Sequence, residues 1–84
     1  MVEIEWTKKA VERLDELEDD VKERIREKVE DASDFPDHYL DRLTGVNAFK
    51  LRIGDYRVIV DWKKDKEKLV ILTLGHRKDI YRNM

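Results

Sequence analysis

The sequence predicts an α+β domain in which a helical hairpin packs on one face of a mostly antiparallel sheet, in the order β-α-α-β-β-β. Three observations support this prediction. An alternating segment opens the chain, two amphipathic segments with short connections follow it, and three segments of β-type pattern fill the second half. Because 84 residues suffice for one modest core, residues 1–84 are expected to form a single domain.

The first half supplies one strand and both helices. Val2–Trp6 alternates between apolar and acidic residues, which is typical of a short strand. Thr7 is a good N-cap for a helix over residues 8–17, where apolar side chains recur at helical spacing. Asp20, followed three residues later by a glutamate, resembles a capping box and predicts the start of a second helix. Phe35 precedes a proline and should end that helix.

The second half supplies three strands. Residues 37–43 are expected to hold one more helical turn, and a turn signal follows it. Strand candidates then cover Ala48–Ile53, Tyr56–Lys63 and Lys68–Leu74. The last of these is apolar on both faces, as expected of a strand buried on both sides. Gly75 is expected to end it and to deliver a basic tripeptide at its carboxyl end.

A hairpin between the first two of these strands gathers cations. A Gly-first loop of two residues, Gly54-Asp55, suits a type II′ turn. With this loop Arg52 lies opposite Arg57, Lys50 lies opposite Ile59, and the three cations share one face. Like charges directly across a ladder are destabilising, so stability does not explain the pairing. An anionic ligand such as phosphate explains it better, although a solvated polar face is the structural alternative.

Charge and composition narrow the function classes. The net charge of −2 divides into −7 for residues 1–42 and +5 for residues 43–84, which indicates a polyanion-binding surface on the basic half. The chain has no cysteine, and two histidines far apart are a poor basis for a metal site. No cofactor is therefore expected. No long apolar run and no leader peptide is evident, so we expect a cytoplasmic protein without a membrane span.

The residues and their order resemble the RelE/ParE toxin superfamily of toxin–antitoxin systems. The shared pattern spans most of the chain and comprises Leu43-x-Gly45, Phe49-Lys50-x-Arg52, Gly54-Asp55-Tyr56-Arg57 and Gly75-His76-Arg77-x-x-x-Tyr81. The resemblance implies a RelE-like fold. It also implies a ribosome-dependent endoribonuclease, an mRNA interferase that cleaves mRNA in the A site without a metal.

The same resemblance implies which residues act. By their positions in the pattern, the catalytic residues are Lys50, Arg52, Arg57, Arg77 and Tyr81. A lysine often stands in RelE-type toxins where this chain has Arg52. Tyr81 either stacks on a splayed base or orients the 2′-hydroxyl, and packing against the sheet edge is its structural alternative.

The chemistry of these side chains suggests their roles. Planar guanidinium groups fit phosphate oxygens, so Arg52 and Arg57 are interpreted as phosphate clamps, with Arg77 on the leaving side. His76 is a candidate for proton transfer, because imidazole titrates near neutral pH. Lys50 is a candidate base if the neighbouring cations favour its neutral form.

Two other functions stay open. One is a ParE-like toxin that inhibits DNA gyrase without cutting RNA, and the other is an inactive homologue that only binds an antitoxin. Gyrase inhibitors of this superfamily usually lack the complete set of cations and tyrosine, which favours the RelE-like function. All three alternatives imply a cognate antitoxin as partner, and the first adds the ribosome and mRNA. The toxin alone is expected to be a monomer.

Overall fold

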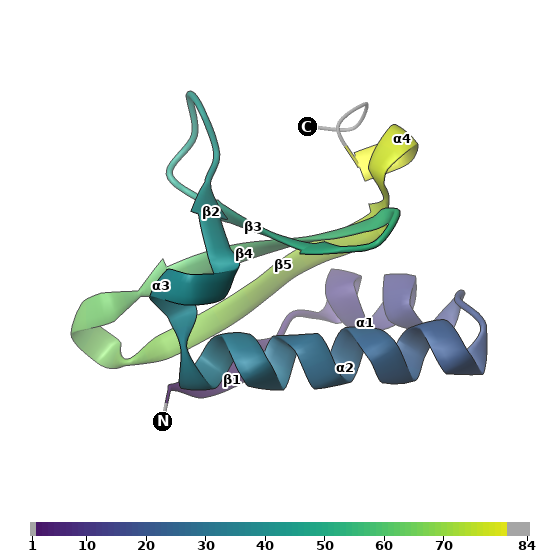
Figure 1. Ribbon diagram of the computed structural model, residues 1–84, viewed down its shortest axis with the longest axis horizontal. Coiled ribbons are helices and arrows are strands. Elements are labelled where there is room, and N and C mark those ends of the chain that lie inside the picture. Colours follow the sequence, from purple (N-terminus) through teal and green to yellow (C-terminus); the bar gives the residue numbers. More distant parts are fainter. Residues whose placement is uncertain (1, 81–84) are drawn as a thin grey trace.

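The computed structural model describes residues 2–80 and has two layers. Helices α1 and α2 lie against one face of a five-stranded sheet, whereas the short α4 stands on the other side (Figure 1). The chain runs through β1 (Glu3–Trp6), α1 (Lys8–Asp15), α2 (Asp19–Asp34), α3 (Pro36–Tyr39), β2 (Leu40–Arg42), β3 (Phe49–Ile53), β4 (Tyr56–Lys63), a 3-10 turn (Lys64–Lys66), β5 (Lys68–His76) and α4 (Arg77–Ile80).

The strands follow the order β1-β5-β4-β3-β2 across the sheet. Only β1 pairs in parallel, with β5, and the other three pairs are antiparallel. The predicted α+β class, with helices on one face of a mostly antiparallel sheet, is confirmed. Strand β2 was not predicted: the expected helical turn over residues 37–43 is the shorter α3, and the next three residues pair with β3.

The β3–β4 hairpin has the predicted register. Ile53 lies opposite Tyr56, Arg52 opposite Arg57, and Lys50 opposite Ile59. Gly54 has a φ of +58°, and the residue after it has no positive φ, as a type II′ turn requires. Turn chemistry and alternation together therefore set which side chains share a face.

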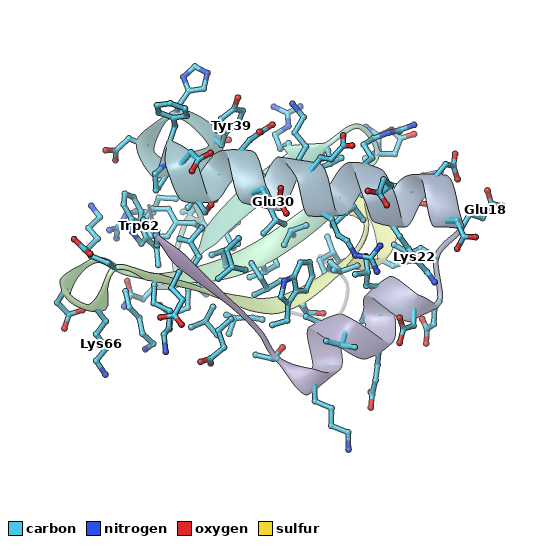
Figure 2. All side chains as sticks on the ribbon, turned by 90° about the horizontal axis from the view of Figure 1, so that it is seen from below. Glu18, Lys22, Glu30, Tyr39, Trp62 and Lys66 are labelled. Carbon is cyan, nitrogen blue, oxygen red and sulfur yellow. The ribbon has the colours of Figure 1, made fainter. Side chains whose placement is uncertain are left out.

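The main core lies between the helices and the sheet. Ala10 and Leu14 of α1 and Ile25 and Val29 of α2 are buried against inward-facing strand residues. Burying a side chain of the size of leucine or isoleucine stabilises a protein by about 1.5–3 kcal/mol. Figure 2 shows that Glu18, just before α2, and Trp62, near the end of β4, lie at opposite ends of the molecule. The buried side chains of α1 and α2 thus hold both helices against this face of the sheet.

The two helix starts differ in how well they were predicted. Thr7 caps α1 as expected, because its hydroxyl accepts a hydrogen bond from the backbone N–H of Ala10 at 3.2 Å. The capping box expected at Asp20 is wrong. Helix α2 begins at Asp19, and its N-cap is Glu18, two residues before the predicted one, which makes no side-chain cap bond. Asp19 and Asp20 lie inside the first turn, where a carboxylate stabilises a helix through the macrodipole.

Strand β5 is longer and less regular than predicted. It continues past Gly75 to His76, and its pairing with β4 shifts by one residue, because Ile71 faces Val60 but Thr73 faces Ile59. The unpaired residue, Leu72, forms a β-bulge and is 36% exposed. The expectation of burial on both faces is therefore wrong at this position, since helices α1 and α2 cover only one face of the sheet.

The hydroxyl of Thr7 fixes this bulge. Its oxygen lies 2.7 Å from the carbonyl oxygen of Ile71 and 3.0 Å from that of Leu72. The same side chain that starts α1 thus holds β5 at the point where its pairing changes. None of the helices in the described part of the chain is long and apolar enough to cross a membrane.

Candidate active site

The predicted cation face is the sheet face opposite α1 and α2. Lys50 and Arg52 of β3 and Arg57 of β4 lie on this face, as their pairing and the burial of their neighbours show. In a hairpin with a two-residue loop, the second pair from the turn is not hydrogen-bonded, and its Cα atoms are only about 4.5 Å apart. Arg52 and Arg57 form this pair. Their side chains therefore begin close together, although their exposure differs strongly.

Arg57 is buried, with 7% of its surface exposed. Its Nη1 donates hydrogen bonds to the carbonyl oxygens of Gly54 at 2.7 Å and of Tyr56 at 2.8 Å. These contacts direct the guanidinium toward the hairpin turn, while Arg52 is exposed. They also use both hydrogens of Nη1, whereas Nε and Nη2 carry three further donors. Arg57 therefore fastens the turn and presents only part of its guanidinium to a ligand.

Arg77 reaches the same turn from the end of β5. Its backbone N–H donates to the carbonyl oxygen of Asp55 at 2.8 Å, which continues the β4–β5 ladder to the hairpin tip. Its Nε lies 3.9 Å from the Asp55 carboxylate, and the two side chains are 55% and 68% exposed. Such an exposed pair contributes at most about 1 kcal/mol. An anionic ligand would face little competition from it for the Arg77 guanidinium.

His76 lies on the opposite face from these cations. It pairs directly with Tyr56, which packs against the main core, and directly opposed residues point to the same side. The two rings meet edge to face, with centroids 5.7 Å apart. Nδ1 of His76 accepts the backbone N–H of Lys78 at 3.2 Å. The structure thus brings Arg77 to the predicted site but not the imidazole beside it in sequence.

Two neighbours of the cations were not predicted. Asp41 of β2 lies directly opposite Lys50, and it was missed because β2 itself was missed. A small second core of Ala48, Ile59 and Ile80 lies on the same face, and Ile80 brings α4 down onto the sheet. Tyr81, the last predicted catalytic residue, lies outside the described residues.

The described residues hold no group of three or more His, Cys, Asp or Glu side chains that could bind a metal ion. The positive charge at the hairpin tip comes from side chains on three elements, β3, β4 and α4. This arrangement is suited to binding a phosphate group through guanidinium and ammonium donors.

Comparison with known proteins identifies the class. The family model for the ParE toxin of type II toxin–antitoxin systems, parDE, matches residues 4–81, and the chain belongs to this family. It is thus a toxin of a type II toxin–antitoxin system, within the RelE/ParE superfamily that the sequence pattern resembles. No curated protein sequence gives a significant match.

Solved structures confirm the fold. The toxin–antitoxin complex RelBE2 from Mycobacterium tuberculosis contains a chain with a TM-score of 0.82 and 24% identity, over 90% of this chain and 98% of that one. The isolated E. coli RelE toxin has a TM-score of 0.78 and 17% identity, over 99% of this chain and 94% of that one. The RelB–RelE complex from Methanococcus jannaschii contains a chain with a TM-score of 0.75 and 22% identity, over 95% of this chain and 98% of that one. Two of these three structures are toxin–antitoxin complexes.

Proposed function

We propose that this toxin is a RelE-like endoribonuclease that enters the ribosomal A site in the cytoplasm and cleaves the mRNA there. One observation carries the proposal: Arg52, Arg57 and Arg77 come from three elements and converge on one hairpin turn, with Lys50 further along the same face. A structural role accounts for Arg57 alone. The exposed Arg52 and Arg77 stabilise nothing comparable, and an anionic substrate explains why they lie here.

The proposed reaction is an attack of the ribose 2′-hydroxyl on the adjacent phosphorus. The bond from the 2′-oxygen to phosphorus forms, and the bond from phosphorus to the 5′-oxygen breaks. The 2′-hydroxyl loses a proton and the leaving oxygen gains one, which gives a 2′,3′-cyclic phosphate and a 5′-hydroxyl. Arg52 and Arg57 would hold the non-bridging oxygens, and Arg77 would stabilise the leaving side. Fixed cations of this kind contribute several kcal/mol to transition-state stabilisation.

Proton transfer falls to other groups. Lys50 would accept the 2′ proton, since it lies on the cation face and is the cation there that can lose a proton. Tyr81 would orient the base or the hydroxyl. The position of His76 beside Tyr56, on the other face, supports no direct proton transfer by its imidazole.

The test is primer extension on mRNA bound to translating ribosomes. Wild type should produce new ends within the A-site codon, and only when ribosomes are present. Arg52→Ala and Arg77→Ala should reduce cleavage about 10²–10³-fold, as expected for loss of a preorganised donor. Arg24→Ala, in the exposed part of α2, is the matched control and should cleave normally. Full activity of both site variants would contradict the proposed site.

A ParE-like function is the second candidate, because the matching family model describes the ParE toxins of parDE systems. Such a toxin would bind DNA gyrase and cleave no RNA. A gyrase supercoiling assay with folded wild-type protein separates the two functions. Inhibition of supercoiling without mRNA cleavage would replace the nuclease proposal. Inactivity in both assays, together with tight antitoxin binding, would indicate an inactive homologue.

A further inference from the structure

We propose that the neutral imidazole of His76 positions Arg77 by capping α4, and that protonation of His76 releases this cap and weakens the toxin as pH falls. The part that concerns activity rests on the proposed function. The part that concerns α4 stands on the contacts of His76 alone.

His76 is the N-cap residue of α4. The helix begins at Arg77, and Nδ1 of His76 accepts the N–H of Lys78, the second helical residue, at 3.2 Å. An N-cap side chain accepts from this position and satisfies one of the unpaired N–H groups of the first turn. Asparagine and aspartate are the common residues in this role, and here an imidazole nitrogen replaces the side-chain oxygen. The contact requires an unprotonated Nδ1.

The cap and the docking of α4 belong to one unit. Ile80, at the other end of α4, is 6% exposed and packs with Ile59 and Ala48. A Cβ atom added to Gly75 would lie 3.8 Å from Cδ1 of Ile80. Helix α4 therefore folds back over the end of β5 (Figure 1). Arg77 lies between the cap and this anchor. Loss of the cap therefore loosens the segment that holds the Arg77 guanidinium at the hairpin turn.

Protonation acts against the cap in three ways. Protonated Nδ1 becomes a donor and faces the N–H donor of Lys78. A positive charge at a helix N-terminus opposes the helix dipole. The new charge also adds to those of Arg77 and Lys78 in α4, and to Lys9 and Arg13 of α1, which line the small cavity beside Gly75.

Fewer groups favour the protonated form. Asp55 at the turn and Asp79 in α4 are the nearby acids, and Asp55 already pairs with Arg77. Tyr56 contacts His76 edge to face and carries no charge that would stabilise a protonated imidazole. The cap therefore requires the neutral imidazole and is lost when Nδ1 of His76 is protonated.

NMR tests the structural step directly. The nuclear Overhauser contacts between the methyl groups of Ile80 and Ile59 should be present at pH 7.5 and weaken at pH 6.0 in wild type. His76→Asn keeps an acceptor without a titrating group, so its contacts should be the same at both pH values. His76→Ala should weaken them at both. His38→Asn is the matched control, since His38 contacts Tyr39 in α3, and it should respond to pH as wild type does. Contacts that stay constant in wild type while His76 titrates would overturn the proposal.

Cleavage on purified, mRNA-programmed ribosomes tests the consequence for activity. Wild-type activity, relative to His76→Asn at each pH, should be lower at pH 6.0 than at pH 7.5. An inactive but well-docked His76→Asn would instead make the imidazole a proton-transfer group and overturn the positioning role. If wild type cleaves at no pH, the proposed function fails, and the NMR result still decides whether His76 controls α4.

Discussion

The two arginines that face each other in the hairpin should contribute oppositely to stability. Arg57→Met keeps an aliphatic stem but removes two hydrogen bonds to turn carbonyls, at 2.7 and 2.8 Å. Hydrogen bonds from a charged donor contribute about 1.5–3 kcal/mol each. Water can hydrogen-bond to the carbonyl of the exposed Gly54, which offsets part of the lost free energy. Removal of the cation also relieves about 0.2–1 kcal/mol of repulsion from Arg52. We expect a net loss of about 2 kcal/mol.

Arg52→Met is the matched control. Its exposed guanidinium forms no hydrogen bond or ion pair with the described residues, so the substitution removes only the repulsion. We expect a change within about 0.5 kcal/mol, toward higher stability. Thermal unfolding, followed by the fluorescence of Trp6 and Trp62, measures both. For a domain of this size 2 kcal/mol corresponds to about 8–16 °C in Tm.

Equal Tm values for the two variants would refute this reasoning, because they would mean that the contacts of Arg57 to the turn contribute nothing. The outcome also affects how activity is interpreted. If Arg57→Met is destabilised as expected, loss of cleavage in any Arg57 variant does not by itself show phosphate binding. Arg52 and Arg77 are then the informative positions for the chemistry.

Three further predictions concern stability, measured by urea unfolding. Thr7→Val should lose about 1–2 kcal/mol, because it removes both the cap of α1 and the contact to the β5 bulge, whereas Thr7→Ser should retain most of this; equal losses would contradict the role of the hydroxyl. Gly54→Ala should lose about 1 kcal/mol or more, since its φ is +58°. Gly75→Ala is its control, with no atom closer than 3.8 Å to the added carbon and no positive φ, and a larger loss there than at Gly54 would refute the turn argument. Ile25→Ala should lose about 2–5 kcal/mol, because Ile25 is completely buried, and a loss under 1 kcal/mol would place it outside the core.

The sequence predicted the hairpin well because two local signals agreed there. The Gly-first turn and the strict alternation of Phe49–Ile53 both require the same register, and that register brings Arg52 opposite Arg57. The burial of Arg57 was not predictable in this way. It depends on where the guanidinium finds carbonyl acceptors, which only the folded turn shows.

Elements held by tertiary pairing were the ones missed. Strand β2 has three residues, Leu40–Arg42, which is too short for a periodic pattern, and it exists because β3 offers a free edge. The position of His76 was missed for a related reason. In a regular strand, side chains alternate between the two faces, and continuing this alternation from Leu69 would place His76 on the same face as the cations. The extra residue, Leu72, shifts the alternation and places His76 on the other face.

The bulge in β5 therefore shifts the alternation of side chains between the two faces of the sheet by one residue. Everything after Leu72 is displaced by one position, so Leu74 enters the core, Gly75 lies beside Arg57, and His76 turns away. Re-pairing the strand without the bulge would send Leu74 into solvent and bring the imidazole to the open face. An insertion or deletion of one residue here would exchange the contents of the two faces while the path of the backbone stayed nearly the same. A change in the length of β5 would thus alter which of its side chains lie beside the cations without substituting any site residue.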